Sequence, residues 1–363
     1  MKAKAMVLRE FCQSLELTEV DIPVLTEGQV LVKLAASGVC GSDVHMWKGE
    51  DPRTPRPIIL GHEGVGTVVE VKGQKRTMSG EPLKPGDFIL WNRGLTCGDC
   101  YYCTVLNEPW LCTERKTYGI NRSFSEVPHL NGCYADHIIL AARTDVFKVN
   151  GVTDPAVLVS ASCSGATVAH AFDLHKVQYG DTVLVQGPGP LGVYATAFAR
   201  RMGAAEVFVI GGTQSRLELC REFGATVLLN RRSMTADERR QAIMDKTGGR
   251  GVDVIIEAVG DPSAVHEGLN LLRLGGAYLS VGFSQPPGEC QVDFFREVVR
   301  KNAKIQGVWV SGAKHVYQSM QLVQENQELF AKMVTHRFRL EDANTALEVM
   351  ANRQALKAVL MPE

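Results

Sequence analysis

The fold of the central part of the chain is decided by one stretch, Thr182-Val183-Leu184-Val185-Gln186-Gly187-Pro188-Gly189-Pro190-Leu191-Gly192. An apolar run of strand length leads into a G-x-G-x-x-G turn, and a helix-like segment follows, as a dinucleotide-binding turn requires. The first glycine permits the tight turn, the second lets a pyrophosphate approach the backbone, and the third allows close packing of helix on strand. Pro190 and Leu191 fall in the first helical turn, where free N–H groups attract phosphate. The alternative is a purely structural glycine turn.

Strands and helices alternate on the C-terminal side of this turn. We expect strands over residues 206–212, 252–260 and 276–282, separated by helices over residues 189–203, 215–224 and 263–273. Such alternation indicates βαβ units on a parallel sheet. The sequence therefore predicts a Rossmann dinucleotide-binding domain over residues 166–310.

The N-terminal part of the chain has a different sequence pattern, in which short strand-like runs are separated by Gly- and Pro-rich turns. The strands are expected at residues 4–10, 29–39, 64–73, 87–91 and 134–141. This pattern predicts a barrel-like, largely antiparallel domain over residues 1–165, with its chemistry on loops. The last 50 or so residues return to a mixed pattern.

Composition narrows the classes of function. The 363 residues suffice for two domains, and 39 Lys and Arg against 40 Asp and Glu leave a net charge of −1. A nucleic-acid partner is not expected, since such proteins usually carry a basic surplus. Mean hydropathy is −0.04, and no apolar run is long enough to span a bilayer. Charges interrupt the first 20 residues where a signal peptide needs an apolar core, so we expect a cytoplasmic protein without membrane contact.

Four of the ten cysteines, Cys97, Cys100, Cys103 and Cys112, fall within 16 residues. In a reducing compartment such a cluster is more typical of a metal site than of disulfides. Four closely spaced thiolates favour a closed tetrahedral zinc site with no position open to substrate, and therefore a structural one. The alternative, four unligated thiols on a loop, would leave them open to oxidation.

A second, dispersed group consists of Cys40, the pair His62-Glu63, and Cys163. Two thiolates and one imidazole can supply three zinc ligands and leave a fourth position open, which is the pattern of a catalytic site. Spacing alone does not bring these segments together, and a free cysteine is more often a small buried side chain than a ligand.

The choice of coenzyme depends on the residue about 20 positions beyond the glycine turn, where a carboxylate normally binds the adenosine ribose. Gly211 stands there, so nothing at that position repels a 2′-phosphate. Thr213, Ser215 and Arg216 can contact such a phosphate, which favours NADP weakly over NAD. Arg216 can equally be a solvated residue of the first helical turn.

Taken together, these motifs resemble the zinc-dependent alcohol dehydrogenases of the medium-chain dehydrogenase/reductase superfamily over essentially the whole chain. The resemblance is carried, in the family's order, by GVCGSDVHMWKG, GHEGVGTVVEVKG, CGDCYYC with the later LC, NGCYADHIIL, GPGPLG and VDVIIEAVG. It implies an α/β protein: a GroES-like β-barrel catalytic domain (1–165, with a structural zinc lobe at 93–116), a Rossmann domain (166–310) and a C-terminal return to the catalytic domain (311–363).

The resemblance also implies roles for individual residues. One zinc per chain is catalytic and one structural, the catalytic zinc being bound by Cys40, His62 and Cys163 with Glu63 as an occasional alternative ligand. Asp43 orients the zinc-bound histidine, Ser42 and His45 form a proton relay, and Lys357 lies near the coenzyme pyrophosphate. In the lobe, eight residues separate Cys103 from Cys112, where the family more often has seven.

The expected function is the interconversion of an alcohol, secondary or polyol-like, and its carbonyl compound by hydride transfer to or from NAD or NADP. Two alternatives are a zinc-free quinone or enoyl-type NADPH reductase of the same superfamily and a non-catalytic dinucleotide-binding protein. The zinc-free reductase is not expected to carry both sets of zinc ligands, and a non-catalytic protein is disfavoured because nothing is missing from the catalytic set. The apolar segment 304–310 reads as an edge strand, and the family usually dimerises in this region, so we expect a homodimer or homotetramer.

Trp91, Asn92, Arg93 and Gly94 fall where the family borders its substrate pocket. A guanidinium can hold a carboxylate, phosphate or sulfonate through two parallel hydrogen bonds. We therefore expect a polar substrate, a polyol or an alcohol with an anionic group. The polar side chains Tyr118, Asn121, Arg122 and His129 follow on the loop beyond Cys112. The alternative is that Arg93 pairs with Asp99 or Glu114 and only steadies the lobe.

Overall fold

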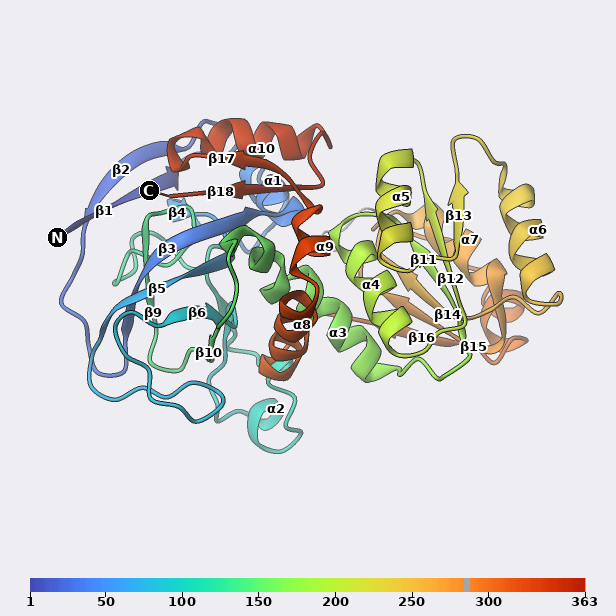
Figure 1. Cartoon of the computed structure of the whole chain (residues 1–363), viewed down its shortest axis with the longest axis horizontal. Coiled ribbons are helices and arrows are strands. Elements are labelled where there is room, and N and C mark those ends of the chain that lie inside the picture. The colour runs from blue at the N-terminus through green and yellow to red at the C-terminus, as the bar shows by residue number, and fades with distance from the viewer. Residues whose placement is uncertain (284–287, 363) are drawn as a thin grey trace. The chain divides into compact units, whose positions relative to one another are not determined.

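The computed structural model describes residues 1–283 and 288–362. The chain divides into two compact units, one formed by Met1–Ala166 with Ser311–Glu363 and the other by Thr167–Val310. Figure 1 colours the chain from the N-terminus to the C-terminus and labels most of its helices and strands. One unit is built on antiparallel sheets and the other on a six-stranded parallel sheet, as the sequence predicted.

The first unit is built mainly from antiparallel strands. Its largest sheet has the order β10-β6-β5-β3-β18-β17, with β9 also paired to β3, and two smaller sheets have the orders β2-β1-β4 and β7-β8. The strands are β1 (Lys2–Leu8), β2 (Glu16–Asp21), β3 (Val30–Val39), β4 (Ile58–Ile59), β5 (Glu63–Val71), β6 (Phe88–Trp91), β7 (Gly94–Leu95), β8 (Lys116–Thr117), β9 (His137–Leu140), β10 (Val146–Lys148), β17 (Val334–Phe338) and β18 (Lys357–Leu360).

Short helices connect these strands. They are α1 (Gly41–Trp47), α2 (Tyr101–Thr104), α8 (Ala313–Glu325), α9 (Gln327–Ala331), α10 (Ala343–Ala351) and the 3₁₀-helices Pro109–Leu111, Pro155–Ser162 and Leu340–Asp342. Helix α3 (Ser164–Leu174) begins in this unit and continues into the second.

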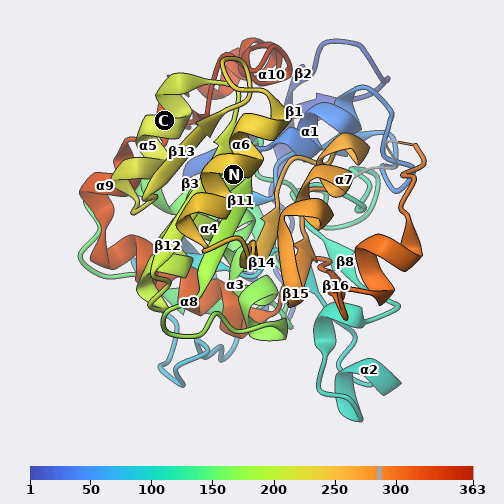
Figure 2. The ribbon, with the colours of Figure 1, turned by 90° about the vertical axis from the view of Figure 1, so that its right-hand side faces the viewer.

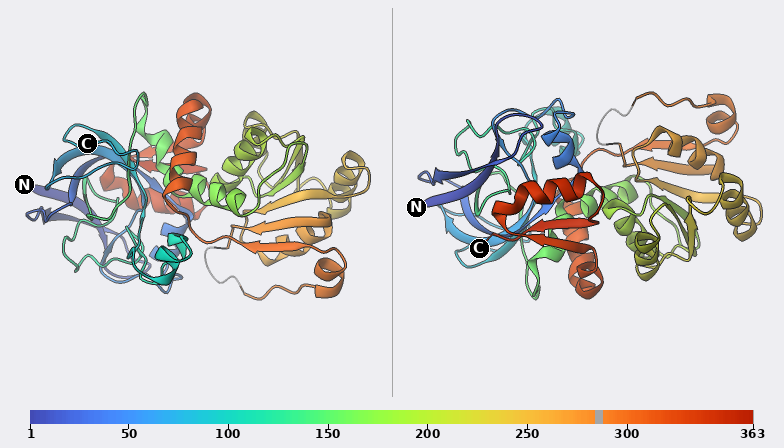
Figure 3. Two further views of the ribbon diagram at one scale, coloured as in Figure 1. Left: turned by 90° about the horizontal axis from the view of Figure 1, so that it is seen from below. Right: turned by 90° about the horizontal axis from the view of Figure 1, so that it is seen from above.

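The central strand of the first unit is β3. It pairs antiparallel with β5, and Val32 stands opposite Val68 in a core of buried aliphatic side chains. The C-terminal strand β18 pairs with the other edge of β3, where Ala358 stands opposite Val39. Figure 3 shows the red C-terminal segment beside the blue N-terminal one. The last residues of the chain are therefore built into the same sheet as residues 30–39.

The second unit is a parallel sheet with helices on both faces (Figure 2). Helices α4 and α5 pack on β11 to β13, and α7 packs on β14 and β15. The strand order is β13-β12-β11-β14-β15-β16. The elements are β11 (Thr182–Gln186), α4 (Pro190–Arg201), β12 (Glu206–Gly211), α5 (Gln214–Glu222), β13 (Val227–Asn230), α6 (Ala236–Lys246), β14 (Val252–Glu257), α7 (Pro262–Leu271), β15 (Leu272–Ser280), the π-helical turn Phe294–Val299 and β16 (Lys304–Gly307).

Three elements of this unit lack a counterpart in the sequence-based prediction, namely β13, α6 and the π-helical turn Phe294–Val299. Helix α6 is mostly charged and lies largely exposed, so apolar periodicity cannot reveal it. Its N-terminal capping box can: the Thr235 hydroxyl accepts from the N–H of Glu238, and the Glu238 carboxylate accepts from the N–H of Thr235.

Among the described residues, no single helix is long and apolar enough to cross a membrane. The bent pair Pro155–Ser162 and Ser164–Leu174 meets the length and composition of a broken span, but most of its side chains are buried within the fold.

Candidate metal centres and coenzyme turn

The dispersed residues Cys40, His62, Glu63 and Cys163 come together in the first unit, with one ligand atom of each within 4.8 Å of all the others. Cys40 follows β3, the pair His62-Glu63 begins β5, and Cys163 ends the 3₁₀-helix Pro155–Ser162. The antiparallel pairing of β3 with β5 brings Gly38 opposite Glu63, and so joins the first two segments.

The ring of His62 is oriented by its neighbours. Its Nε2 faces the Sγ of Cys163 at 3.5 Å, and its Nδ1 lies 3.3 Å from Oδ1 of Asp43. The other Asp43 oxygen accepts from the N–H of Cys40 at 2.7 Å and from the Tyr134 hydroxyl at 3.2 Å. Burial lowers the pKa of His62, but the Asp43 carboxylate and the Cys40 thiolate outweigh it and raise that pKa to about 9.

The donor atoms of this cluster fit zinc. The Cys163 thiol donates to the Cys40 sulfur, which holds the pKa of Cys40 well below its usual range and that of Cys163 well above it. A buried thiolate of this kind needs a cation beside it. Within the described residues, Oε1 of Glu63 is buried without a hydrogen-bond partner. Two sulfurs, one imidazole nitrogen and a nearby carboxylate are ligands that zinc prefers, and three protein ligands leave a position open.

Lys357 forms a buried ion pair beside the cysteine cluster, which the sequence did not predict. Its ammonium lies 2.7 Å from Oε2 of Glu63 and 3.3 Å from the carbonyl oxygen of Val39, and the residue is 1% exposed. The contact of Lys357 with a coenzyme pyrophosphate stays a prediction. The pair needs Gly38, because a Cβ there would lie 2.1 Å from the Glu63 carboxylate.

Ser42 and His45 both lie on α1. The Ser42 hydroxyl is 3.8 Å from the Cys40 sulfur. His45 is partly exposed, and its Nδ1 lies 2.5 Å from Oε2 of Glu50. Glu50 is a partner that the sequence did not point to, because its contact depends on the turn that follows α1.

Arg93 is buried, and its Nη1 donates to the Cys163 sulfur at 2.7 Å. Neither of the ion pairs considered from the sequence, with Asp99 or with Glu114, occurs within the described part of the chain. Asn92, expected to face a substrate, donates to Asp145 at 3.1 Å.

The further polar residues of the expected pocket have structural partners. The Tyr118 hydroxyl bonds to Thr144 at 2.7 Å, and the guanidinium of Arg122 lies over the Tyr118 ring. Asn121 accepts from the N–H of Thr117, and His129 bonds to the carbonyl oxygen of Phe124. These contacts stabilise the loop beyond Cys112 and give no support to direct contact with a substrate.

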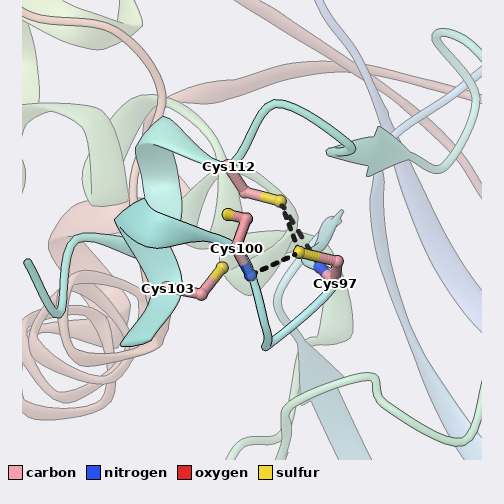
Figure 4. Close-up of side chains that lie close together, drawn as sticks. All are labelled: Cys97, Cys100, Cys103 and Cys112. Carbon is pink, nitrogen blue, oxygen red and sulfur yellow. Dashed lines mark hydrogen bonds between the residues drawn. The ribbon is translucent and has the colours of Figure 1, made fainter. Parts of the chain in front are cut away.

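Figure 4 shows the cysteine quartet, whose four sulfurs approach one another around α2. The N–H of Cys100 donates to the Cys97 sulfur at 3.4 Å, and the Cys112 sulfur lies 3.5 Å from that of Cys97. A hydrogen bond from the N–H of Cys103 lowers the pKa of Cys100 to about 7. The four sulfurs lie within 4.8 Å of one another and one thiol ionises readily, an arrangement that fits a tetrahedral zinc. The extra residue before Cys112 therefore does not move its sulfur away from the other three.

The glycine turn lies between β11 and α4. Gly187 has a positive φ of 99°, and a Cβ on Gly192 would lie 1.9 Å from the Gly187 carbonyl oxygen, so both positions require glycine. Gly189 is the N-cap of α4, with open space where a Cβ would stand, and Pro190 and Leu191 form the first turn. The N–H groups at the start of α4 fit a phosphate.

Gly211 ends β12, and Thr213 is the N-cap of α5, whose first turn contains Arg216. Sequence reasoning missed two arginines near this loop. A Cβ on Gly212 would lie 3.2 Å from Nε of Arg231 and 3.5 Å from Nε of Arg232. Both arginines follow β13, an element that was not predicted, so their position could not be inferred.

Comparisons with known proteins agree with this geometry. Residues 26–151 match the model of the alcohol dehydrogenase GroES-like domain, and residues 190–325 match that of the zinc-binding dehydrogenases. The chain is 34% identical to 5-exo-hydroxycamphor dehydrogenase of Pseudomonas putida over 99% of this chain and 98% of that protein. It is 30% identical to L-threonine 3-dehydrogenase of Escherichia coli over 99% of both chains.

Solved structures give the same result. An alcohol dehydrogenase from Thermotoga maritima is 52% identical, with a TM-score of 0.98 over 100% of both chains. A zinc-binding dehydrogenase from Sinorhizobium meliloti, bound to NADP, is 25% identical, with a TM-score of 0.87 over 100% of both chains. The chain thus belongs to the zinc-dependent alcohol dehydrogenases of the medium-chain dehydrogenase/reductase superfamily.

Proposed function

We propose that the protein interconverts an alcohol and the corresponding carbonyl compound by hydride transfer to or from NAD(P). The observation that carries this proposal is the buried cluster of Cys40, His62 and Cys163 with Glu63 beside it. Zinc held by these residues would supply a Lewis acid that lowers the pKa of an alcohol hydroxyl.

The protein's own residues prepare this site. Cys40, His62 and Cys163 supply the ligand atoms, and Asp43 holds the imidazole with Nε2 toward the sulfurs. Glu63 is the alternative ligand, supported by its unpartnered Oε1 among the described residues.

The proton released from the alcohol leaves by way of α1. The Ser42 hydroxyl, beside Cys40, accepts it and passes its own proton to His45. The His45 imidazole is partly exposed and contacts Glu50, and it passes the proton on to solvent. The second cluster, in the lobe at residues 93–116, would hold a structural zinc.

The coenzyme lies with its pyrophosphate at the glycine turn and the start of α4. We favour NADP, since the Gly211–Arg216 loop has no carboxylate and Arg231 and Arg232 stand beside it. The catalytic domain comprises residues 1–165 and 311–363, and the coenzyme domain residues 166–310. A homodimeric or homotetrameric assembly and a cytoplasmic location stay predictions.

Metal analysis and a matched pair of variants test this function. We expect two zinc ions per chain, and NAD(P)-dependent turnover in a screen of secondary alcohols and polyols. Cys163→Ala should lose turnover and one zinc, since a ligand atom is removed. Cys220→Ala is the control, because Cys220 is buried in the second unit, outside both clusters. Burial raises the pKa of Cys220 to about 12, so it stays a neutral thiol at pH 7.

Several results would contradict the proposal. A protein that binds no zinc would instead match a zinc-free reductase or a non-catalytic dinucleotide-binding protein. A Cys163→Ala variant with normal zinc content and turnover would show that the cluster is not the metal site.

A further inference from the structure

We propose that the alcohol site selects substrates carrying an oxyanion, a carboxylate or a phosphate, bound by Arg93 and Arg115. This inference rests on the proposed function and deepens it, because it names the substrate class.

Arg93 lies next to the cysteine cluster. It comes two residues after β6, is 6% exposed, and donates from Nη1 to the Cys163 sulfur at 2.7 Å. Its Nε is buried and has no hydrogen-bond partner among the described residues. One side of this guanidinium is therefore held by a zinc ligand while the Nε–H stays available.

Arg115 lies close to Arg93. A Cβ on Gly94 would lie 2.1 Å from Nη2 of Arg115, so the side chain packs directly against the residue after Arg93. Its Nη1 donates to the Thr117 hydroxyl at 3.0 Å, whereas Nε and Nη2 are buried without a partner in the part of the chain that the structure describes. Nε and Nη2 are the two donors with which a guanidinium holds a carboxylate side-on.

The local charge is positive. Burial, followed by the charges of Arg93 and Arg53, lowers the pKa of Arg115 to about 9. Arg53 already pairs with the buried carboxylate of Asp51, at 2.5 Å. Within the described residues, neither Arg93 nor Arg115 has a carboxylate within 4.0 Å.

A structural role alone does not explain this arrangement. Buried cations are normally paired, because an uncompensated charge and unsatisfied N–H donors are costly to remove from water. The Cys163 sulfur accepts one hydrogen bond from Arg93, but as a protonated thiol it supplies no counter-charge. An oxyanion on the substrate would accept hydrogen bonds from the unpartnered N–H groups of Arg115 and Arg93. Its negative charge would neutralise part of the positive charge of the two guanidinium groups.

Kinetics on matched alcohols test the inference. The pairs are D-gluconate with D-sorbitol, 3-hydroxybutyrate with its methyl ester, and glycerol 3-phosphate with glycerol, which separate carboxylate from phosphate recognition. The parent should show a higher kcat/KM for the charged member of at least one pair. In Arg115→Gln and Arg93→Gln this ratio should fall on the order of 10- to 100-fold, as expected for losing hydrogen bonds to a charged group.

Two controls accompany these variants. Arg9→Gln removes one positive charge from an exposed position of the same unit and should leave the ratio unchanged. Zinc content is measured for every variant, since Arg93 contacts a proposed zinc ligand. Arg115→Gln should retain both zinc ions, because the Arg115 side chain bonds to Thr117 and only its backbone N–H contacts Cys112, which the substitution keeps.

The outcomes are distinct. Equal or better turnover of the neutral member in every pair would overturn the inference while leaving the dehydrogenase function in place. A charge preference that persists in both arginine variants would overturn the assignment to Arg93 and Arg115. No turnover of any alcohol with either coenzyme, with zinc bound, would contradict the proposed function itself and this inference with it.

Discussion

Lys357 and Glu63 form an ion pair inside the first unit, with Nζ 2.7 Å from Oε2 and side-chain exposures of 2% and 0%. The pair joins β18, near the C-terminus, to the start of β5. Burial lowers the pKa of Lys357, but the Glu63 carboxylate outweighs it and raises that pKa, so the ammonium stays charged. The pair therefore places two opposite charges beside the proposed zinc site.

Lys357→Met should destabilise the protein by about 3 to 5 kcal/mol, because it leaves a buried carboxylate without its counter-charge. Denaturant unfolding of the apoprotein measures this. Lys2→Met is the control, since Lys2 pairs with Glu19 in solvent and its removal should leave the midpoint unchanged. Equal midpoints for Lys357→Met and the parent would show that the buried pair is not charged.

Cys100→Ala should lower the zinc content from two ions to one per chain and reduce the melting temperature. A closed zinc site contributes folding free energy, and three thiolates hold the metal less tightly than four. Cys12→Ala, at an exposed cysteine outside both clusters, should change neither quantity. A Cys100→Ala protein as heat-stable as the parent would mean that the quartet binds no structural metal.

The double variant Arg231→Ala/Arg232→Ala should raise KM for NADP on the order of tenfold, with little change for NAD, because a 2′-phosphate loses its counter-charges. Arg240→Ala, an exposed arginine on α6, is the control. Gly211→Asp is a poor test of the same question: a Cβ there would lie 2.5 Å from Cγ of Pro188. A parent that already prefers NAD strongly would contradict the phosphate site.

Asp154 should make stability depend on pH. Its carboxylate accepts hydrogen bonds from Arg337, at 3.0 and 2.5 Å, and this contact lowers the pKa of Asp154. A lowered folded-state pKa contributes stability above the unfolded-state value, near 4, and that stability is lost as pH falls through the folded-state pKa.

Asp154→Asn removes the charge but keeps an oxygen to cap the 3₁₀-helix Pro155–Ser162. At pH 7 it should cost about 0.5 to 1 kcal/mol of unfolding free energy, since the pair is partly exposed. The difference from the parent should shrink below pH 4. A difference that is constant from pH 3 to pH 7 would rule out the ion pair as its source.

Strand β16 should contribute to an interface between copies of the chain. It is the outermost strand of its sheet, and Ile305 and the nearby Trp309 are exposed. An uncovered edge with apolar side chains pairs readily with another chain. Sedimentation at micromolar concentration should show a dimer or tetramer, and Ile305→Asp should weaken it. A stable monomer of the parent protein would contradict this prediction.

The sequence by itself determined the features that depend on neighbouring residues. The glycine turn after Val185 required only a strand, three glycines and a helix, all within one short stretch. The cysteine quartet is likewise local, because four thiols within 16 residues indicate a metal site by their spacing alone. Helix α6 was not predicted, because it buries few apolar side chains and its sequence therefore lacks the apolar periodicity that indicates a helix.

Only the tertiary structure decided which distant residues meet. Cys40 and Cys163 are brought together by the pairing of β3 with β5 and by the 3₁₀-helix that ends at Ser162. The contact of the Lys357 ammonium with Glu63 likewise depends on the tertiary structure, because it requires β18 to pair with β3. Such contacts depend on strand register across separations of 100 residues or more, for which a single sequence has no local signal.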